Sequence, residues 1–315
     1  MHHPVLLSEI LEYLNPNQGL YTGFYLDATF GRGGHSRAIL ERLGPEAGLY
    51  ACDRDAAAAE SAESLMRRMT LNSSNTKFNF YKTAFSGIFD FLKEQEVFGE
   101  LSGLLLDLGV SSPQLDDPRR GFSFRHNGPL DMRMDQSTGT SAAEWLATVE
   151  AETLAQVLKT YGEEKFSKKI AAAIVETRLE QPLLETATLA ALVARVIPKK
   201  FHEKNKHPAT RTFQAIRIYL NRELDELEKF LNLSHNALKR GGRLLVVSFH
   251  SLEDRMVKNF IQEGSRPKLK TLPWEPEMPE PKWLKISQKP IFPTETEIKI
   301  NPRARSAVLR VAEKL

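Results

Sequence analysis

Three glycines within four residues, placed directly after a short apolar run, constrain this chain more than any other feature. The apolar run ends at Asp27, and Gly31, Gly33 and Gly34 follow. Positions 36–45 then have the apolar spacing of a helix. The pattern predicts a strand, a glycine turn and a helix start, where a ligand can lie against bare backbone at the helix N-terminus. The alternative is a tight strand-to-helix turn that holds no ligand.

The glycine spacing departs from the dinucleotide-binding fingerprint G-x-G-x-x-G. The third glycine of that fingerprint would fall at position 36, which is Ser36. The carboxylate of Asp27 would repel a pyrophosphate but can accept a hydrogen bond from an ammonium group. Because S-adenosylmethionine carries an amino group and no phosphate, the turn favours this cofactor over NAD.

A second acid supports a nucleoside cofactor. Asp53 ends the apolar run 49–52 and lies twenty residues beyond Gly33, the interval at which doubly wound folds place an acid that holds ribose hydroxyls. NAD and S-adenosylmethionine sites share this feature. The alternative is that an acid here caps the alanine-rich helix 56–69, which fits Asp55 better because Asp55 directly precedes that helix.

The order of the predicted elements indicates an α/β fold with a doubly wound, Rossmann-like sheet and an inserted α-helical domain. The fourth and fifth strands are separated by far more chain than a crossover needs, and that interval contains several amphipathic helices. We expect the insertion at 113–206, between residues 1–112 and 207–315 of the sheet domain. The predicted strands are 24–27, 49–52, 78–81, 103–107 and 243–249.

Three predictions concern the C-terminal half. A single helix over about 210–231 would return the chain to the sheet. The proline-rich segment 266–293 would be an irregular excursion. Residues 295–300 and 306–311 alternate around a turn at Asn301-Pro302, which predicts an antiparallel hairpin at the edge of the sheet.

Composition limits the classes of partner. The single cysteine, Cys52, excludes an internal disulfide and a thiolate metal site and fits a reducing cytoplasm, and we expect no metal. No apolar run is long enough to span a bilayer, so we expect no membrane partner. The net charge of +3 permits a nucleic-acid partner without requiring one. The densest basic run, Lys199 to Pro208, is the first candidate for phosphate contacts, with a solvated loop as the alternative.

Seven segments of the chain resemble the MraW family of bacterial ribosomal RNA small subunit methyltransferases H, and the resemblance runs nearly end to end. These segments are DATFGRGGHS (27–36), LDLGVSSPQLD (106–116), GFSF (121–124), GPLDMRM (128–134), HPATRTFQA (207–215), SFHSLED (248–254) and NPRARS (301–306). The resemblance implies a methyltransferase that uses S-adenosylmethionine to methylate N4 of a cytidine in the decoding region of 16S ribosomal RNA, with the helical insertion recognising this substrate. Whether the substrate is free RNA or the small ribosomal subunit, and whether the chain forms a homodimer, stays open.

The resemblance also implies site residues. Gly33, Gly34 and His35 would contact the methionine part of the cofactor and Asp53 its ribose, and the adenine or neighbouring groups would be contacted by Phe85, Asp107 and Gln114. A lone phenylalanine such as Phe85 is also compatible with a core position. The candidates for substrate contacts are Arg133, Lys206, His207, Arg211, His250, Arg303 and Arg305; for the two arginines near the C-terminus the alternative is an ordinary charged turn.

Methylation of cytosine N4 requires acceptors more than strong acids or bases. The nitrogen lone pair is delocalised into the ring, so acceptors that hold the N–H bonds would favour a pyramidal nitrogen and remove the proton after transfer. Ser112 and Asp131 are the candidate catalytic residues, and the target base must be unstacked to reach them. Two other functions are considered: a nucleotide-dependent oxidoreductase, and a ribosome-assembly RNA-binding protein with a vestigial cofactor pocket.

Overall fold

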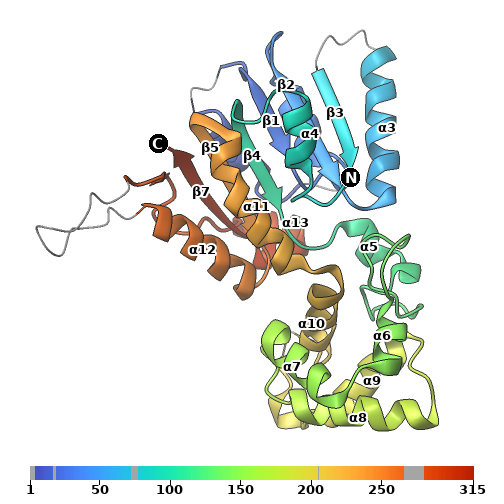
Figure 1. Ribbon diagram of the computed structural model, residues 1–315. Helices are drawn as coiled ribbons and strands as arrows, with labels where there is room; N and C mark the ends of the chain where they lie inside the picture. The colour runs from blue at the N-terminus through green and yellow to red at the C-terminus, as the bar shows by residue number, and fades with distance from the viewer. Residues whose placement is uncertain (1–3, 17–18, 72–76, 205, 266–279) are drawn as a thin grey trace, which may run out of the picture. The chain divides into compact units, whose positions relative to one another are not determined.

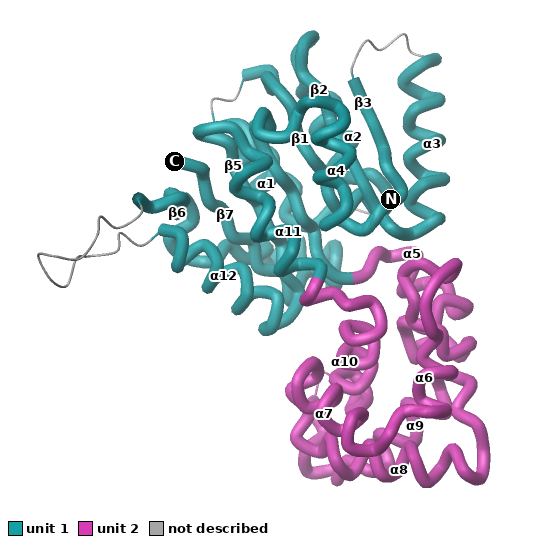
Figure 2. Tube along the Cα trace, viewed as in Figure 1, with its two compact units in different colours: residues 1–109, 226–315 teal, residues 110–225 magenta. Residues whose placement is uncertain are grey.

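The computed structural model describes residues 4–16, 19–71, 77–204, 206–265 and 280–315. The chain divides into two compact units, a sheet unit formed by residues 1–109 and 226–315 and a helical unit formed by residues 110–225 (Figure 2). The helical unit contains the whole of the predicted insertion 113–206. Within the described ranges, no helix combines the length and the apolar character that crossing a membrane takes.

The sheet unit contains seven strands in the order β3-β2-β1-β4-β5-β7-β6 (Figure 1). Strands β1 to β5 pair in parallel, and β7 is antiparallel to both β5 and β6. The order reverses between β1 and β4, the place where open α/β sheets bind ligands. The predicted Rossmann-like class is confirmed. The strands are β1 Phe24–Asp27, β2 Gly48–Asp53, β3 Lys77–Lys82, β4 Leu101–Asp107, β5 Leu238–Ser248, β6 Trp283–Lys285 and β7 Val308–Lys314.

Helices cover both faces of this sheet, which is why its central strands are apolar on both sides. Leu104 of β4 packs in a core with Phe230 of α11, whereas the next residue, Leu105, packs in a core with Ile10 of α1. Helices α4, α11 and α12 contribute to the first core, and α1 and α2 to the second. The helices are α1 Leu7–Leu14, α2 Gly34–Leu40, α3 Ala56–Leu71, α4 Ile88–Glu94, α11 Glu223–Ala237, α12 Ser251–Ser265 and α13 Glu295–Ile300.

The predicted C-terminal hairpin is wrong. Residues 295–300 form α13, because the hydroxyl of Thr294 accepts a hydrogen bond from the backbone N–H of Glu297 at 3.2 Å and caps a helix. The strand that follows, β7, pairs with β5 and β6 instead. Part of the predicted irregular segment is also regular, since Trp283–Lys285 forms edge strand β6. Residues 266–279 of that segment lie outside the described residues.

The helical unit buries one apolar core of its own, as a bundle of amphipathic helices should. Leu154 and Leu158 of α7, Ile170 of α8, Leu189 of α9 and Ile216 of α10 are fully buried within it. Its elements are α5 Ser112–Asp116, the 3₁₀ turn η1 Pro118–Arg120, α6 Ala142–Thr148, α7 Ala151–Gly162, α8 Ser167–Glu180, α9 Thr186–Val196, the 3₁₀ turn η2 Lys199–Phe201 and α10 Thr210–Asn221.

The single helix predicted over 210–231 is also wrong, because the chain breaks at Arg222. This residue adopts the left-handed conformation with φ 52° and ends α10. On either side of the break the apolar residues serve different cores: Phe213 of α10 is buried in the helical unit, and Leu227 of α11 is buried in the sheet unit. A continuous apolar stripe therefore concealed two helices.

Candidate functional site

The glycine turn after β1 is close-packed, so its glycines cannot carry side chains. Gly33 precedes α2 in the left-handed conformation with φ 71°, and a Cβ there would lie 2.5 Å from the ring of Phe30. A Cβ on Gly34 would lie 2.5 Å from Cγ of Pro4. The N-terminal segment therefore covers the turn at the start of α2.

Asp27, the last residue of β1, carries a buried carboxylate that is only 1% exposed. It accepts hydrogen bonds from the hydroxyl of Ser36 at 2.7 Å and from the backbone N–H of Thr29 at 3.2 Å. Burial raises the pKa of Asp27, and the nearby His35 and the Ser36 hydrogen bond offset part of this effect. Ser36, which replaces the third glycine of the dinucleotide fingerprint, thus donates a hydrogen bond to the carboxylate of Asp27.

Asp53 ends β2 and reaches across to the glycine turn. Its carboxylate accepts the backbone N–H of Gly31 at 2.8 Å and that of Asp55 at 2.9 Å. Burial raises its pKa to about 6. The helix cap belongs to Asp55, whose carboxylate accepts the N–H of Ala57 at 3.0 Å. The two acids therefore have separate tasks, and Asp53 is the one beside the turn.

Asp107 ends β4 and lies next to His35. The backbone N–H of Asp107 donates to the hydroxyl of Thr29 at 2.6 Å, and its Oδ2 lies 3.7 Å from Nδ1 of His35. His35 Nε2 donates to the carbonyl of Val5 at 3.0 Å, which fixes the orientation of the ring. Burial raises the pKa of Asp107 to about 6, with His35 opposing the rise. Its Oδ1 is buried and has no hydrogen-bond partner among the described residues.

Three carboxylates consequently stand at the carboxyl ends of three neighbouring strands, β2, β1 and β4, beside the glycine turn. Asp27 raises the pKa of both Asp53 and Asp107, because like charges in a buried setting disfavour one another. A ligand with positive charge would relieve this repulsion, whereas a pyrophosphate would add to it. The local electrostatics therefore favour a cationic ligand with hydroxyl groups.

Phe85 lies in the loop after β3, and the structure places its ring against the core of the sheet unit. The ring packs edge to face with Phe230 of α11 at 5.8 Å between centroids and is half-buried. This packing does not prevent its accessible part from contacting a ligand. The core position of Phe85 and its predicted contact with the cofactor are therefore compatible.

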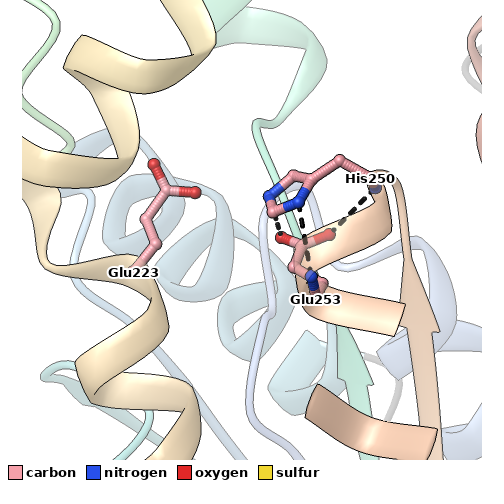
Figure 3. Close-up of side chains that lie close together, drawn as sticks. All are labelled: Glu223, His250 and Glu253. Carbon is pink, nitrogen blue, oxygen red and sulfur yellow. Dashed lines mark hydrogen bonds and ion pairs between the residues drawn. The ribbon is translucent and has the colours of Figure 1, made fainter. Parts of the chain in front are cut away.

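His250 lies two residues after the end of β5 and immediately before α12, in a reciprocal cap with Glu253 (Figure 3). Its Nδ1 accepts the backbone N–H of Glu253 at 3.3 Å, and the Glu253 carboxylate accepts the N–H groups of Phe249 at 2.8 Å and of His250 at 3.3 Å. His250 Nε2 lies 3.1 Å from Glu253 Oε1. The predicted substrate residue therefore has a structural role as a helix cap.

The two predicted arginines near the C-terminus lie in a short 3₁₀ turn, η3 Pro302–Ser306. Asn301 caps it by accepting the N–H of Arg303 at 3.2 Å, and Ala304 is fully buried below. Arg305 is exposed and Arg303 is half-buried. The turn thus presents at least one guanidinium group to solvent from a fixed backbone.

In the helical unit, α5 begins with a capping box. Gln114 is buried, and its side-chain oxygen accepts the backbone N–H of Ser111 at 2.8 Å. The next residue, Ser112, is half-buried, and its hydroxyl makes no hydrogen bond to any other residue that the structure describes. Ser111 and Gln114 are structural, which leaves the Ser112 hydroxyl available.

Asp131 is fully engaged by two neighbours. Arg133 donates to it from its backbone N–H at 3.0 Å and from its guanidinium at 2.8 and 2.9 Å, and Gln136 donates at 3.1 Å. These four bonds fill the acceptor positions of a carboxylate. Burial raises the pKa of Asp131, but the Arg133 bonds outweigh it and the pKa is lowered overall. The Arg133 guanidinium also donates to the carbonyl of Gly139 at 3.2 Å.

The other predicted substrate residues of the helical unit lie around the start of α10. The ring of His207 lies 4.6 Å from the ring of Phe124, tilted by 39°, and its Nδ1 accepts the N–H of Ala209 at 3.2 Å. Arg211 pairs with Glu203 at 2.8 Å, and Lys206 is exposed. The region is thus basic and carries a partly accessible aromatic pair.

Sequence reasoning missed an aromatic cavity in the same unit. The ring of Tyr219 lies 4.7 Å from that of Trp145 and 6.3 Å from that of Tyr161. The only available signal was the set of large aromatic residues on separate helices. The cavity, of about 460 Å³, is lined by Thr140, Trp145, Tyr161, Ile218, Tyr219, Leu220, Arg222, Leu224 and Asp225.

Comparison with known proteins decides between the cofactors that this geometry allows. The model of the MraW methylase family matches residues 1–315. The chain belongs to the MraW methylase family. It is 51% identical over 318 aligned residues to the ribosomal RNA small subunit methyltransferase H of Hydrogenovibrio crunogenus, covering 100% of this chain and 96% of that protein. As an MraW methylase it is a methyltransferase that uses S-adenosylmethionine, and neither the oxidoreductase nor the vestigial-pocket alternative is favoured.

Solved structures resemble this MraW methylase only distantly. A methyltransferase-like protein from Streptococcus mutans in complex with SAH matches at 13% identity over 100% of both chains, with a TM-score of 0.40. An S-adenosylmethionine-dependent O-methyltransferase from Thermotoga maritima matches at 12% identity over 99% of this chain and 72% of that chain, with a TM-score of 0.35. At these scores the likeness carries no conclusion about function.

Proposed function

We propose that this MraW methylase methylates N4 of a cytidine in the decoding region of 16S ribosomal RNA, within the small ribosomal subunit. The relative from Hydrogenovibrio crunogenus bears a name that specifies ribosomal RNA of the small subunit. The observation that carries the chemistry is the set of three carboxylates, Asp27, Asp53 and Asp107, around a glycine turn. Such an enzyme would work in the cytoplasm, where ribosomes assemble.

The residues of the sheet unit suit S-adenosylmethionine. Gly33, Gly34 and His35 would lie along its methionine part, and the Asp53 carboxylate would accept the ribose hydroxyls. The unpartnered Asp107 Oδ1 offers an acceptor for an amino group. Phe85, and Gln114 from the helical unit, are proposed beside the adenine. When bound, the cofactor supplies a methyl group already activated on a sulfonium, so the task of the protein is to hold donor and acceptor in line.

Ser112 is the better candidate for the residue that accepts a hydrogen bond from the amine, whose proton is then released to solvent after methyl transfer. Its hydroxyl makes no hydrogen bond to another residue that the structure describes, whereas the four acceptor positions of Asp131 are occupied by Arg133 and Gln136. We propose that Ser112 accepts one N–H bond of the cytosine amine. Asp131 would then act by fixing the guanidinium of Arg133 for contact with the RNA.

The basic residues would hold the RNA by its phosphates. In the helical unit these are Arg133, Lys206, His207 and Arg211, and in the sheet unit Arg303 and Arg305. The ring of His250 is held by Glu253, so His250 would act by fixing the start of α12 and not by contacting a phosphate. Arginine forks suit bidentate contacts with phosphate, and phosphate contacts fix the orientation of a nucleic acid without reading its sequence. The target cytidine must leave its stack to reach Ser112, so an exposed nucleotide is the preferred substrate.

Transfer of a labelled methyl group tests this proposal. The protein is incubated with methyl-labelled S-adenosylmethionine and small ribosomal subunits that lack the modification, and the digested RNA is examined by mass spectrometry. We expect N4-methylcytidine at one position of 16S ribosomal RNA. Calorimetry with NADH as the matched control ligand should show no binding. Label on another base, or RNA binding without any transfer, would contradict the proposal.

A further inference from the structure

Two segments of the helical unit that are distant in sequence meet at an exposed aromatic pair. The ring of Phe166, at the start of α8, lies 5.1 Å from the ring of Phe201 in η2, at an interplanar angle of 60°. Phe201 is 52% exposed. A single exposed phenylalanine is ordinary on a protein surface, so its surroundings decide what it does.

Those surroundings are strongly basic. The six lysines that lie within three positions of the two rings in the sequence are all exposed, and none forms an ion pair with another residue that the structure describes. Lys200 Nζ lies 5.2 Å from the centroid of the Phe201 ring. The lysines are Lys165, Lys168 and Lys169 around Phe166, and Lys199, Lys200 and Lys204 around Phe201.

Acidic residues in the same segments do little to neutralise this charge. The buried carboxylate of Glu164 accepts the backbone N–H of Phe166 at 2.8 Å. Glu203 is paired with Arg211. Glu163 is a third acid in these segments and is exposed. Six exposed lysines against three acids, two of which are bonded as described, leave an excess of positive charge that attracts polyanions.

The backbone that carries Phe201 is held in place. Its N–H donates to the carbonyl of Pro198 at 2.9 Å, and His202 Nε2 donates to the carbonyl of the buried Ile197 at 2.9 Å. An aromatic ring on a fixed turn loses little conformational freedom when a partner stacks on it. The ring of Phe201 is therefore exposed to solvent on a backbone that is fixed by hydrogen bonds.

We propose that this surface, formed by Phe166, Phe201 and the six lysines, binds an unpaired stretch of the RNA substrate away from the nucleotide that is methylated. The inference rests on the proposed function, since it takes ribosomal RNA as the substrate. Bases stack on aromatic faces while lysines follow the phosphates, which is the usual way of holding single-stranded nucleic acid. An acidic protein segment would use the lysines but not the stacking face. The surface adjoins the predicted contacts at Lys206, His207 and Arg211, since Arg211 pairs with Glu203, and extends them to the aromatic pair and the lysines of α8.

Binding of a fluorescent single-stranded RNA of about 12 nucleotides tests the surface. The triple variant Lys165→Gln, Lys168→Gln, Lys169→Gln should lower the slope of log affinity against log salt by about 2, since each lost phosphate contact contributes roughly 0.7. Phe201→Leu should weaken binding roughly 5- to 100-fold, because one stacked base is lost. Phe201→Trp, which keeps an aromatic face, should bind within about twofold of the wild type.

Matched controls come from the sheet unit. Lys258, Lys289 and Lys299 are exposed lysines and Phe292 is 59% exposed, so their substitution by Gln and Leu should change neither the affinity nor the salt slope. Thermal melts and S-adenosylmethionine affinity should match the wild type in every variant, which separates a lost contact from a lost fold.

The outcomes are distinguishable. Variants at Phe201 and the three lysines that bind RNA like the wild type, while the wild type methylates ribosomal RNA, would overturn this surface and leave the proposed function standing. Equal affinity for a duplex RNA, or equal competition by polyglutamate, would overturn the choice of unpaired RNA as the partner. A wild type that transfers no methyl group to ribosomal RNA would instead overturn the proposed function.

Discussion

The hydroxyl of Ser36 donates a hydrogen bond of 2.7 Å to the buried carboxylate of Asp27. This glycine turn differs from a dinucleotide-binding turn at these two residues, and the hydrogen bond shows that the two differences belong together. Where a third glycine would admit a pyrophosphate, a serine supports an acid. The preference for a cationic ligand is thus built into the turn itself.

Removal of this hydroxyl should destabilise the protein. We expect Ser36→Ala to lower the free energy of unfolding by about 1–3 kcal/mol, because a buried carboxylate loses a hydrogen-bond donor. Urea denaturation measures the change. Ser8→Ala, at an exposed serine of α1, should stay within about 0.5 kcal/mol of the wild type. Equal losses in the two variants would show that the Ser36 bond contributes nothing specific.

Asp53 and Asp55 form a natural pair for testing the cofactor assignment. Asp53→Ala should weaken S-adenosylmethionine binding by roughly 10- to 100-fold, since hydrogen bonds to a charged group are lost. Asp55→Ala should leave the Kd unchanged and lower stability by about 1 kcal/mol, because Asp55 caps α3. Isothermal calorimetry gives the Kd and thermal unfolding gives the stability. Full methylation by Asp53→Ala would refute the assignment.

Cofactor binding should depend on pH in the mildly acidic range. Burial raises the pKa of Asp53 and of Asp107 to about 6, and a cationic ligand binds the ionised forms better. Affinity should therefore rise from pH 5 to pH 7, by roughly tenfold for each carboxylate that must ionise. In Asp53→Asn, the Kd should change less with pH across this range than in the wild type, because the contribution of Asp53 ionisation is removed. A flat profile in the wild type would contradict this role.

The same carboxylates set the pH dependence of stability without cofactor. Because the folded protein binds these protons more tightly than the unfolded chain, the free energy of unfolding should fall as pH rises from about 4 to about 6, and level off above. Urea unfolding of Asp53→Asn at several pH values should show a shallower decline. A steeper decline would mean that the pKa of Asp53 is lowered by folding rather than raised.

Substitution of the adjacent residues Ser111 and Ser112 can distinguish a role in methyl transfer from a role in helix capping. Ser112→Ala should lower kcat by on the order of 10- to 100-fold with unchanged stability, because an acceptor for the amine is removed. Ser111→Ala should lower stability by about 1 kcal/mol through loss of the capping box and change kcat far less. Single-turnover methyl transfer measures the rate. Equal kcat losses in the two variants would remove Ser112 from the proposed mechanism.

The sequence predicted correctly those features that depend on residues close to one another in the chain. The apolar run ending at Asp27, the glycines after it and the interval to Asp53 located the turn and its acids, since strands, turns and helix starts depend on neighbouring residues. The partners of those acids could not be predicted, because the contact of Asp53 with Gly31 crosses from one strand end to another. The error at 295–300 has the opposite origin: the cap by Thr294 outweighed an alternating pattern.

The break at Arg222 shows a further limit of sequence patterns. Its left-handed backbone falls inside an uninterrupted helical stripe, and neither glycine nor proline marks it. Only the existence of two separate cores explains why the helix ends there. Likewise, Asp131 and Arg133 were predicted for different tasks, and their mutual ion pair followed only from the fold.

The covering of the glycine turn by the N-terminal segment has a consequence for folding during synthesis. The N–H of Leu6 donates to the carboxylate of Glu297 at 2.7 Å, and β7, which completes the pairing of β5, occupies 308–314. Residues 4–6 can therefore be held over the turn through this contact only after residue 297 has been synthesised. The helical unit, residues 110–225, can form earlier in synthesis, because it buries a core of its own.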